Sequence, residues 1–457
     1  PLRCSSSQGR ASRVARPENA RKGGRPHPET RTRGGQAMLA AAARTAARLV
    51  ARGRRHTPRG FASSAVAAEP PDVIAPGRFT VEELEMQPTA TAKPVPSKEA
   101  LLGMFGKFFS DHMLEADWTA DEGWGAPRIH AQGNLEISPA ASCLHYALQC
   151  FEGMKAYRGA DDRLRLFRPE LNARRLNSSL RRLVMPEIPE DAFVQCVAKL
   201  VAADATWVPP GEGYSAYLRP TVIATDPYLG VNAPSMVKFF ALLSPVGPYW
   251  PDGFRPITVA AETTAVRAWP GGAGFAKIGG NYAPTIMPQT RAADRSDAQQ
   301  VLYCTPEGTG DAAPPRHRVT EVGSMNIVVV RRTPDGRTEL VTPTLARDDI
   351  LPGVTRASIL DLARAKRADL GLDDVLEQDL YLEDDLIQAH ADGRLLEVFG
   401  VGTAAIVCPI KSIVLGAGRL DLPTGDDAGR IATSLLEDLT AVHYGRADPF
   451  GWSYLVE

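Results

Sequence analysis

The sequence predicts a mixed α/β protein (α+β or α/β) of two domains joined by a short linker. The chain has 457 residues, 44% of them apolar, which is more than one hydrophobic core usually holds. Strand and helix signals alternate from about residue 97 onward. A stretch rich in proline and glycine, PVGPYWPDGF (residues 245–254), interrupts them. We therefore expect a small α/β domain over residues 95–247, a linker over 248–256 and a large domain over 257–457.

The first half is predicted to contain strands and one long helix. Apolar and β-branched runs predict strands at residues 144–157, 163–167, 217–224 and 239–244. Pro169 follows the second of these strands. Because proline favours the first position of a helix, we expect a helix to open there.

The second half repeats strand, turn and helix signals. Strands are expected at residues 257–262, 299–304, 327–332 and 339–342. The last two flank the turn Pro334-Asp335-Gly336, which predicts a hairpin. Pro284 stands where a helix could begin, and LPGVTRASILDLARA (residues 351–365) has the pattern of an amphipathic helix.

Charge is distributed unevenly along the chain. Residues 1–68 hold 15 of the 52 basic residues and only two of the 53 acidic ones, Glu18 and Glu29. The remaining residues contain 37 basic and 51 acidic side chains, a net charge of −14. Phosphate backbones are bound by clustered Lys and Arg, so we expect no nucleic-acid partner for the folded part.

The segment that begins at Met38, MLAAAARTAARLVARGRRHTPRGFASSAVAAE, is rich in Ala and Arg and has no acidic residue before Glu69. This composition is typical of a mitochondrial transit peptide, with a plastid address or a disordered basic tail as alternatives. Residues 1–37 resemble an upstream segment without structure. No run of about 18 apolar residues occurs, so we expect no membrane partner.

Cysteine and histidine patterns predict neither a disulfide framework nor a metal centre. The cysteines Cys4, Cys143, Cys150, Cys196, Cys304 and Cys408 form no C-x-x-C pair. The eight histidines show no metal-ligand spacing. The compartment is therefore expected to be reducing.

Lys277 stands in WPGGAGFAKIGGNY (residues 269–282), where five glycines surround a single lysine. Such a loop suits an amine that must approach a ligand closely, as a nucleophilic lysine does. The alternative is an exposed lysine in a flexible turn. The loop alone favours that alternative, so other residues must decide.

Two further segments offer groups for an anion and for a ring nitrogen. Helix 351–365 would begin with the unpaired amides of Val354 and Thr355, which suit a phosphate, and FGVGTAAIVCP (residues 399–409) adds Thr403. TEVGSMN places Glu321 in an apolar context, where a carboxylate needs a partner. An amine, a phosphate turn and a carboxylate for a pyridine nitrogen together indicate pyridoxal phosphate.

From Phe105 to the C-terminus, the chain closely resembles branched-chain amino acid aminotransferases of the pyridoxal-phosphate fold type IV class. Seven segments carry the resemblance in the family's order: HYALQCFEGMKAY, LFRPELNARR, YLRPTVIATDPYLGV, GFAKIGGNY, TEVGSMN, LPGVTR and GTAAIVCP. The resemblance implies that L-leucine, L-isoleucine or L-valine exchanges its amino group with 2-oxoglutarate, in a homodimer.

The resemblance also implies roles for individual residues. Lys277 would bond to the cofactor aldehyde and transfer the substrate proton. The other cofactor-binding residues would be Arg175 with Val354, Thr355 and Thr403 at the phosphate, Tyr282 at the ring hydroxyl and Glu321 at the ring nitrogen. The substrate-binding residues would be Phe105, Phe151, Tyr217, Tyr249, Arg219, Ser324, Ala404 and, from the other subunit, Tyr146.

The chain also departs from the family pattern. Mammalian members have C-x-x-C where this chain has Ala405 to Cys408, so a redox switch by that disulfide is excluded. Ser324 and Val328 replace a threonine and an aromatic residue, and the loop over residues 305–317 is slightly longer.

Two other functions fit part of the pattern. A D-amino acid aminotransferase or aminodeoxychorismate lyase of the same fold is opposed by Phe105 and by the triplet Tyr217-Leu218-Arg219. A scaffold without catalysis would have lost Lys277 or its partners.

Overall fold

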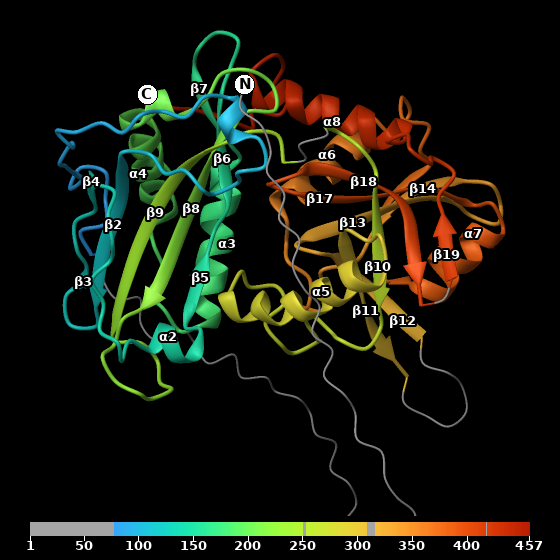
Figure 1. Cartoon of the computed structure of the whole chain (residues 1–457), viewed down its shortest axis with the longest axis horizontal. Helices are drawn as coiled ribbons and strands as arrows, with labels where there is room; N and C mark the ends of the chain where they lie inside the picture. The colour runs from blue at the N-terminus through green and yellow to red at the C-terminus, as the bar shows by residue number, and fades with distance from the viewer. Residues whose placement is uncertain (1–76, 250–252, 309–315, 417) are drawn as a thin grey trace, which may run out of the picture. The chain divides into compact units, whose positions relative to one another are not determined.

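The computed structural model of the chain describes residues 77–249, 253–308, 316–416 and 418–457 (Figure 1). These residues belong to one compact unit. The predicted transit peptide and Cys4 lie outside the described residues, as do parts of the predicted linker and of the longer loop over residues 305–317.

Among the described residues, one sheet of ten strands is built mainly from the first half of the chain. Its order is β1-β4-β2-β9-β8-β6-β7-β20, with β3 beside β2 and β5 beside β8. The strands are β1 (Glu85–Met86), β2 (His112–Thr119), β3 (Gly123–Trp124), β4 (Arg128–Ala131), β5 (Gln149–Phe151), β6 (Met154–Arg158), β7 (Leu164–Phe167), β8 (Ser215–Ala224), β9 (Met236–Val246) and β20 (Ser453–Leu455).

Two helices cover one face of this sheet, α3 (Pro169–Arg182) and α4 (Glu190–Ala203), both green in Figure 1. Leu176 and Leu180 of α3 and Phe193 and Val197 of α4 join one buried cluster with the strands. The short helices nearby are η2 (Glu99–Leu101), α2 (Ser142–Tyr146) and η3 (Ala205–Trp207).

A second sheet, also of ten strands in the described part of the chain, has the order β15-β14-β13-β17-β18-β10-β11-β12-β16, with β19 beside β18. The strands are β10 (Ile257–Glu262), β11 (Gln300–Glu307), β12 (Arg316–Val322), β13 (Met325–Arg332), β14 (Thr338–Thr342), β15 (Asp374–Glu377), β16 (Leu380–Tyr381), β17 (Leu395–Gly402), β18 (Ile406–Leu415) and β19 (Gly418–Asp421).

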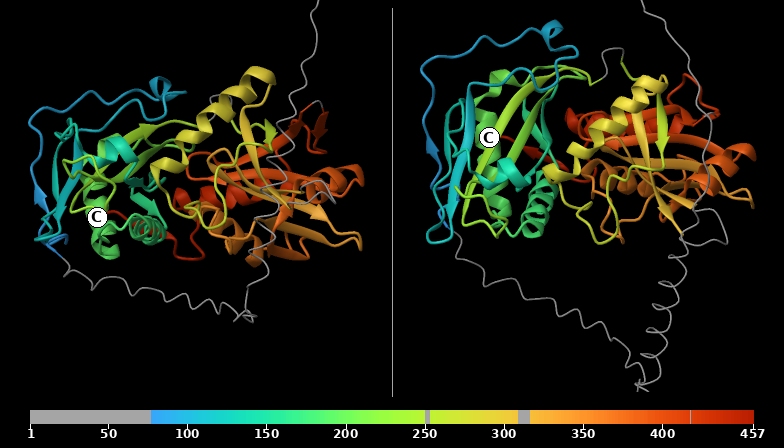
Figure 2. Two further views of the ribbon diagram at one scale, coloured as in Figure 1. Left: turned by 90° about the horizontal axis from the view of Figure 1, so that it is seen from below. Right: turned by 60° about the horizontal axis from the view of Figure 1, so that its bottom comes forward.

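The helices of the second half are η4 (Gly279–Asn281), η5 (Ala283–Thr285), α5 (Ile286–Arg295), α6 (Val354–Ala365), η6 (Leu382–Gln388), α7 (Ala389–Ala391) and α8 (Arg430–His443). Helices α6 and α8 cover one face of the second sheet. The views of Figure 2 place α5, in yellow, beside the boundary between the green and the orange halves.

Strand β13 shows why the second sheet is so apolar in sequence. Val328 and Val330 pack with α6 and α8, whereas Ile327 and Val329 pack in a separate cluster on the opposite face. Successive side chains of a strand point to opposite faces. The sequence of a strand that is covered on both faces is therefore apolar at every position.

Most predicted elements are confirmed, but the strand predicted over residues 144–157 is wrong in part. Helix α2 occupies its start and ends at Tyr146, and the next residue, Ala147, has a left-handed φ of 53°. Strands β5 and β6 follow, and both pair with β8. The ladder breaks between them opposite Pro220, which has no N–H to donate.

Two further differences concern Pro284 and the C-terminus. Pro284 lies in η5, one short turn before α5 begins at Ile286. Strand β20 pairs with β7, Ser453 opposite Phe167, so the last residues return to the first sheet. The domain boundaries given above stay predictions.

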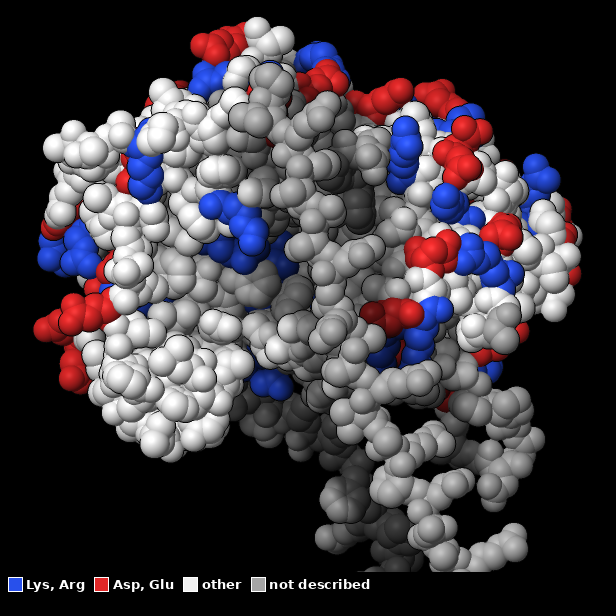
Figure 3. All heavy atoms as spheres, viewed as in Figure 1, with Lys and Arg blue, Asp and Glu red and all other residues white. Residues whose placement is uncertain are grey.

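Charged side chains of both signs are interspersed on the right-hand part of the face in Figure 3. Many charges of the second half are paired, for example Arg337 with Asp374 and Lys366 with Asp438. Exposed pairs of this kind contribute little to stability, about 0–1 kcal/mol each.

Candidate active site

A cavity of about 370 Å³ is lined by residues of both sheets and of the loops between them. The lining residues are Phe105, Phe151, Gly153, Arg175, Tyr217, Arg219, Tyr249, Lys277, Tyr282, Ser324, Asn326, Leu351, Gly353, Val354, Thr355, Val401, Gly402, Thr403 and Ala404. The structure therefore brings together all the predicted site residues except Glu321 and Tyr146.

Lys277 is anchored through its backbone to the first half of the chain. Its N–H donates to Ser179 Oγ at 2.8 Å, and its carbonyl accepts the Phe151 N–H at 3.0 Å. The side chain then extends into the cavity, where Nζ donates to the Tyr282 hydroxyl at 2.9 Å. Nζ also lies 4.6 Å from the centroid of the Phe151 ring. The amine is thus held in place by neutral groups.

Tyr282 is surrounded by cations. Burial opposes ionisation of its hydroxyl, but the positive charges of Lys277, Arg267 and Arg175 outweigh burial and lower the pKa of Tyr282 below its ordinary value. A phenol of lowered pKa beside an amine is a strong hydrogen-bond partner for a charged neighbour.

Arg175 of α3 is fixed by a carboxylate from the break between β5 and β6. Its Nε and Nη2 donate to the two oxygens of Glu152 at 2.8 and 2.7 Å, and Nη1 donates to the Pro352 carbonyl at 3.1 Å. Glu152 is fully buried and also accepts from Asn172 at 2.8 Å. A guanidinium has five N–H groups, so two of those of Arg175 are left for a ligand.

The N-terminus of α6 and the turn between β17 and β18 face the same end of the cavity. Helix α6 begins at Val354, so the amides of Val354 and Thr355 lack acceptors within the helix. Thr403 belongs to the turn and lines the same cavity. These donors and Arg175 form a cradle for an anion.

Glu321 does not line the cavity but forms hydrogen bonds with two residues that do. Its Oε1 accepts the Leu351 N–H at 3.0 Å and the Asn326 side-chain amide at 3.3 Å. Its Oε2 is paired with Arg267, and both side chains are buried. Arg267 is thus a charged partner of this carboxylate, for which the sequence predicts a pyridine nitrogen as partner.

Aromatic rings form the opposite wall of the cavity. Phe105 meets Tyr217 edge to face at a centroid distance of 4.9 Å and Tyr249 at 5.9 Å. Phe151 lies 5.0 Å from Tyr282. The rings give this wall a largely apolar surface of fixed shape.

The Arg219 guanidinium lies beside two of these rings. Arg219 donates to the Tyr217 hydroxyl at 3.3 Å, and its guanidinium carbon lies 4.9 Å from the Phe151 centroid. By contrast, Tyr146 does not line this cavity: it is 41% exposed and donates to the Leu229 carbonyl at 3.3 Å.

Residues 149–413 match the protein family described as amino-transferase class IV. The chain is 42% identical to a branched-chain-amino-acid aminotransferase of Dictyostelium discoideum over 381 residues, which cover 83% of this chain and 96% of that protein. It is also 42% identical to the mitochondrial branched-chain-amino-acid aminotransferase of Bos taurus over 364 residues, 79% of this chain and 88% of that one. Relatives named as cytosolic match at similar identity.

The chain belongs to the class IV aminotransferase family. Among solved structures, a branched-chain amino acid aminotransferase from Thermobaculum terrenum in its PLP form has a TM-score of 0.57 at 22% identity, covering 75% of this chain and 98% of that chain. That likeness shows that the two proteins share a fold. The predicted fold type IV is confirmed.

Two of the glycines beside Lys277, Gly274 and Gly279, serve the protein's own packing in this aminotransferase. A Cβ on Gly274 would lie 2.3 Å from the Asp349 carbonyl oxygen, and one on Gly279 would lie 2.4 Å from Gln149 Nε2. At these two positions the missing side chain gives clearance to neighbouring residues. The sequence predicts instead that the glycines let an amine approach a ligand closely.

Sequence reasoning missed two charged residues of the aminotransferase site, Glu152 and Arg267. Each is buried and pairs with a predicted site residue, Arg175 and Glu321 respectively. One signal was available, because each stands alone as a charge within an apolar stretch, CFEGM and AVRAW. A buried charge in such a context needs a partner.

Three further observations concern the described residues only. The five cysteines among them are buried thiols. No group of three or more potential metal ligands is found there. None of their helices combines the length and apolar character needed to cross a membrane.

Proposed function

We propose that this aminotransferase transfers the amino group of L-leucine, L-isoleucine or L-valine to 2-oxoglutarate, with pyridoxal 5′-phosphate as cofactor. The products are branched-chain 2-oxo acids and L-glutamate. The observation that carries the proposal is one cavity that joins the Lys277 amine, an anion cradle and an aromatic wall. The names of the relatives agree with it.

The donor set of the cavity fits the cofactor. The α6 amides, Thr403 and the two remaining N–H groups of Arg175 suit its phosphate, and Tyr282 suits its ring hydroxyl. We assign the ring nitrogen to Glu321, whose charge is held by Arg267. When bound, the cofactor supplies an aldehyde that condenses with amines and a ring that withdraws electrons from the substrate Cα.

The residues of the chain then move and hold protons. Lys277 takes the proton from the substrate Cα and returns it at the next step, since Nζ is the amine that enters the cavity. Tyr282 keeps that amine in place between the two transfers. Because the first oxo acid leaves before the second one enters, the two half-reactions alternate.

The aromatic wall sets the side-chain preference. The rings of Phe105, Tyr217 and Tyr249 select a side chain mainly by shape, so one misplaced methylene lowers kcat/KM by only roughly 10- to 200-fold. We therefore expect activity with all three branched-chain amino acids.

A panel of amino donors tests the reaction. With 2-oxoglutarate as acceptor, the purified protein should release glutamate from leucine, isoleucine and valine. D-alanine and aminodeoxychorismate serve as comparison substrates. A preference for either of them would reject the proposal in favour of another activity of the same fold.

Arg219 is proposed to bind the distal carboxylate of 2-oxoglutarate. Replacing Arg219 with alanine should lower kcat/KM for 2-oxoglutarate by about 10- to 100-fold, the value of a charge-assisted hydrogen bond. The half-reaction with leucine, which has no second carboxylate, should change less. Steady-state kinetics with both substrates measures the ratio.

The matched control for Arg219 is Arg182→Ala, which removes an exposed arginine of α3. This variant should leave kcat/KM unchanged for both leucine and 2-oxoglutarate. Equal losses for leucine and 2-oxoglutarate in Arg219→Ala would reject the assigned role.

We further propose that the protein is a homodimer. Leu144 and Tyr146 of α2 and Leu229 and Val231 of the β8–β9 loop are all exposed, and Tyr146 bonds to Leu229. An exposed apolar patch of this kind suits a protein interface. Tyr146 of the partner subunit would then complete the substrate pocket. A solution mass of one chain would contradict the assignment.

We also propose import into mitochondria, on the composition of residues 38–69. A fluorescent protein fused behind residues 1–76 should collect in mitochondria. Collection in the cytosol or in plastids would reject this assignment.

A further inference from the structure

Lys155 is a buried lysine of β6 that has not been given a role. Its Nζ donates to the carbonyl oxygen of Ala404 at 2.8 Å, across 249 positions of sequence. Ala404 belongs to the turn between β17 and β18, which lines the large cavity. The contact therefore connects the first sheet to one side of the anion cradle.

The environment of Lys155 makes its burial costly. Burial lowers the pKa of Lys155 to about 8. Among the described residues no carboxylate forms an ion pair with it; the neighbouring His443 has a pKa lowered to about 3 by burial and then by the charge of Lys155. A buried cation without a counter-ion is unfavourable unless nearby acceptors or anions offset the cost.

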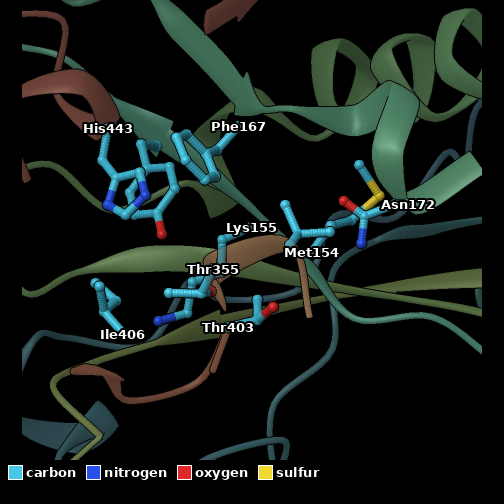
Figure 4. A pocket seen from close by; sticks show the side chains of 10 residues that line it. Met154, Lys155, Phe167, Asn172, Thr355, Thr403, Ile406 and His443 are labelled. Atoms are coloured by element: carbon cyan, nitrogen blue, oxygen red, sulfur yellow. The ribbon is translucent and has the colours of Figure 1, made fainter. Parts of the chain in front are cut away.

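A second, small cavity of about 20 Å³ adjoins Lys155. Figure 4 shows Lys155 extending toward Thr355 and Thr403, with His443 and Phe167 above it. Val354, Thr355 and Thr403 line both this cavity and the large one. The lysine thus lies next to the anion cradle, on a side separate from Arg175.

The turn that Lys155 contacts has an unfavourable backbone conformation at one residue. Ile406, which pairs with Gly402 across the turn, has a φ of 62°, a left-handed conformation that a β-branched residue rarely adopts. Such a conformation persists only where surrounding contacts hold it. The bond to Ala404 is one such contact. The same bond holds the Ala404 carbonyl oxygen, which carries a partial negative charge and would repel an anion if it faced the cradle.

We propose that Lys155 is a positioning residue that holds the carbonyl of Ala404 and so keeps the turn of residues 402–406 in the conformation that presents Thr403 and Ala404 to anions. This inference rests on the proposed function, because the anions would be the cofactor phosphate and a substrate carboxylate. Lys155 acts through the turn and touches neither reacting atom.

The test compares two cofactor forms that differ only in the anion. Full-length protein freed of cofactor is titrated with pyridoxal 5′-phosphate and with pyridoxal, and binding is followed by absorbance. Lys155→Met, which keeps the length but removes the amine, should weaken binding of the phosphate ester by about tenfold, the value of one charge-assisted hydrogen bond. Binding of pyridoxal should stay within about twofold, because the phosphate cradle does not contact it.

Two further variants separate positioning from general damage. Lys155→Arg keeps a cationic donor and should restore most of the affinity for the phosphate ester. Lys93→Met is the matched control, since Lys93 Nζ likewise donates to a backbone carbonyl, that of Ser110 at 2.7 Å, but outside the cavity. It should leave both affinities unchanged. If Lys155→Met does not fold, Lys155→Gln takes its place.

The outcomes are distinguishable. If Lys155→Met binds both compounds equally more weakly, or binds both as tightly as the unaltered protein does, the role of Lys155 is overturned while the proposed function stands. Failure of the unaltered protein to bind either compound would overturn the proposed function and this inference with it. The KM for 2-oxoglutarate gives a second measurement: it should rise in Lys155→Met more than kcat falls.

Discussion

Replacing Lys277 with alanine should lower transamination at least about 10²- to 10⁴-fold, the contribution of general acid–base catalysis alone. The structure gives the reason. In the described cavity the Nζ of Lys277 is the amine that reaches the lining surface, and no second lysine lines it. Turnover of leucine with 2-oxoglutarate measures the loss.

Covalent trapping distinguishes loss of the amine from loss of the fold. Borohydride should fix the cofactor on the peptide that carries Lys277 in the unaltered protein, and mass spectrometry should find no such adduct in the alanine variant. Lys199→Ala removes an exposed lysine of α4 and should retain both activity and adduct. Undiminished turnover in Lys277→Ala would reject the mechanism.

The parts of the fold that could be predicted are those where local pattern and tertiary environment agree. Strand β10 and helices α3 and α6 begin at or close to the predicted residues, because Pro169 and Pro352-Gly353 act locally and the apolar runs are covered on both faces. The strand prediction around Ala147 was wrong because local pattern and structure disagree there. The apolar composition of this segment suits a strand, but a left-handed residue ends a short helix there.

In the candidate site too, residues with a local sequence signal could be predicted and residues without one could not. Residues such as Lys277 and Thr403 were predicted because glycine-rich turns and helix starts have local sequence signals and because seven segments resemble the family in its order. The partners Glu152 and Arg267 were not, because an ion pair depends on which segments meet in space. The sequence separation is 23 residues for Glu152 and Arg175 and 54 for Arg267 and Glu321. Nor could pattern show that Gly274 makes room for Asp349.

Replacing Glu152 with alanine should destabilise the protein by about 3–5 kcal/mol, the cost of leaving a buried charge without its partner. Arg175 would lose the two bonds of 2.8 and 2.7 Å that fix its guanidinium, and its side chain is only 6% exposed. Urea unfolding measures the loss. The matched control is Glu187→Ala, because Glu187 forms a bond of 2.6 Å with Arg181 at the exposed surface. That variant should cost only about 0–1 kcal/mol.

A double variant separates the stability of this pair from its role in the site. Glu152→Leu with Arg175→Met removes both charges, and replacing a buried ion pair with apolar residues is often neutral for stability. We therefore expect the double variant to recover most of the lost unfolding free energy. Its affinity for pyridoxal 5′-phosphate should nevertheless remain low, because the cradle has lost the guanidinium that Glu152 orients. Recovery of both properties would mean that Arg175 is a structural residue, whereas a single-variant cost below about 1 kcal/mol would mean that the pair is not effectively buried.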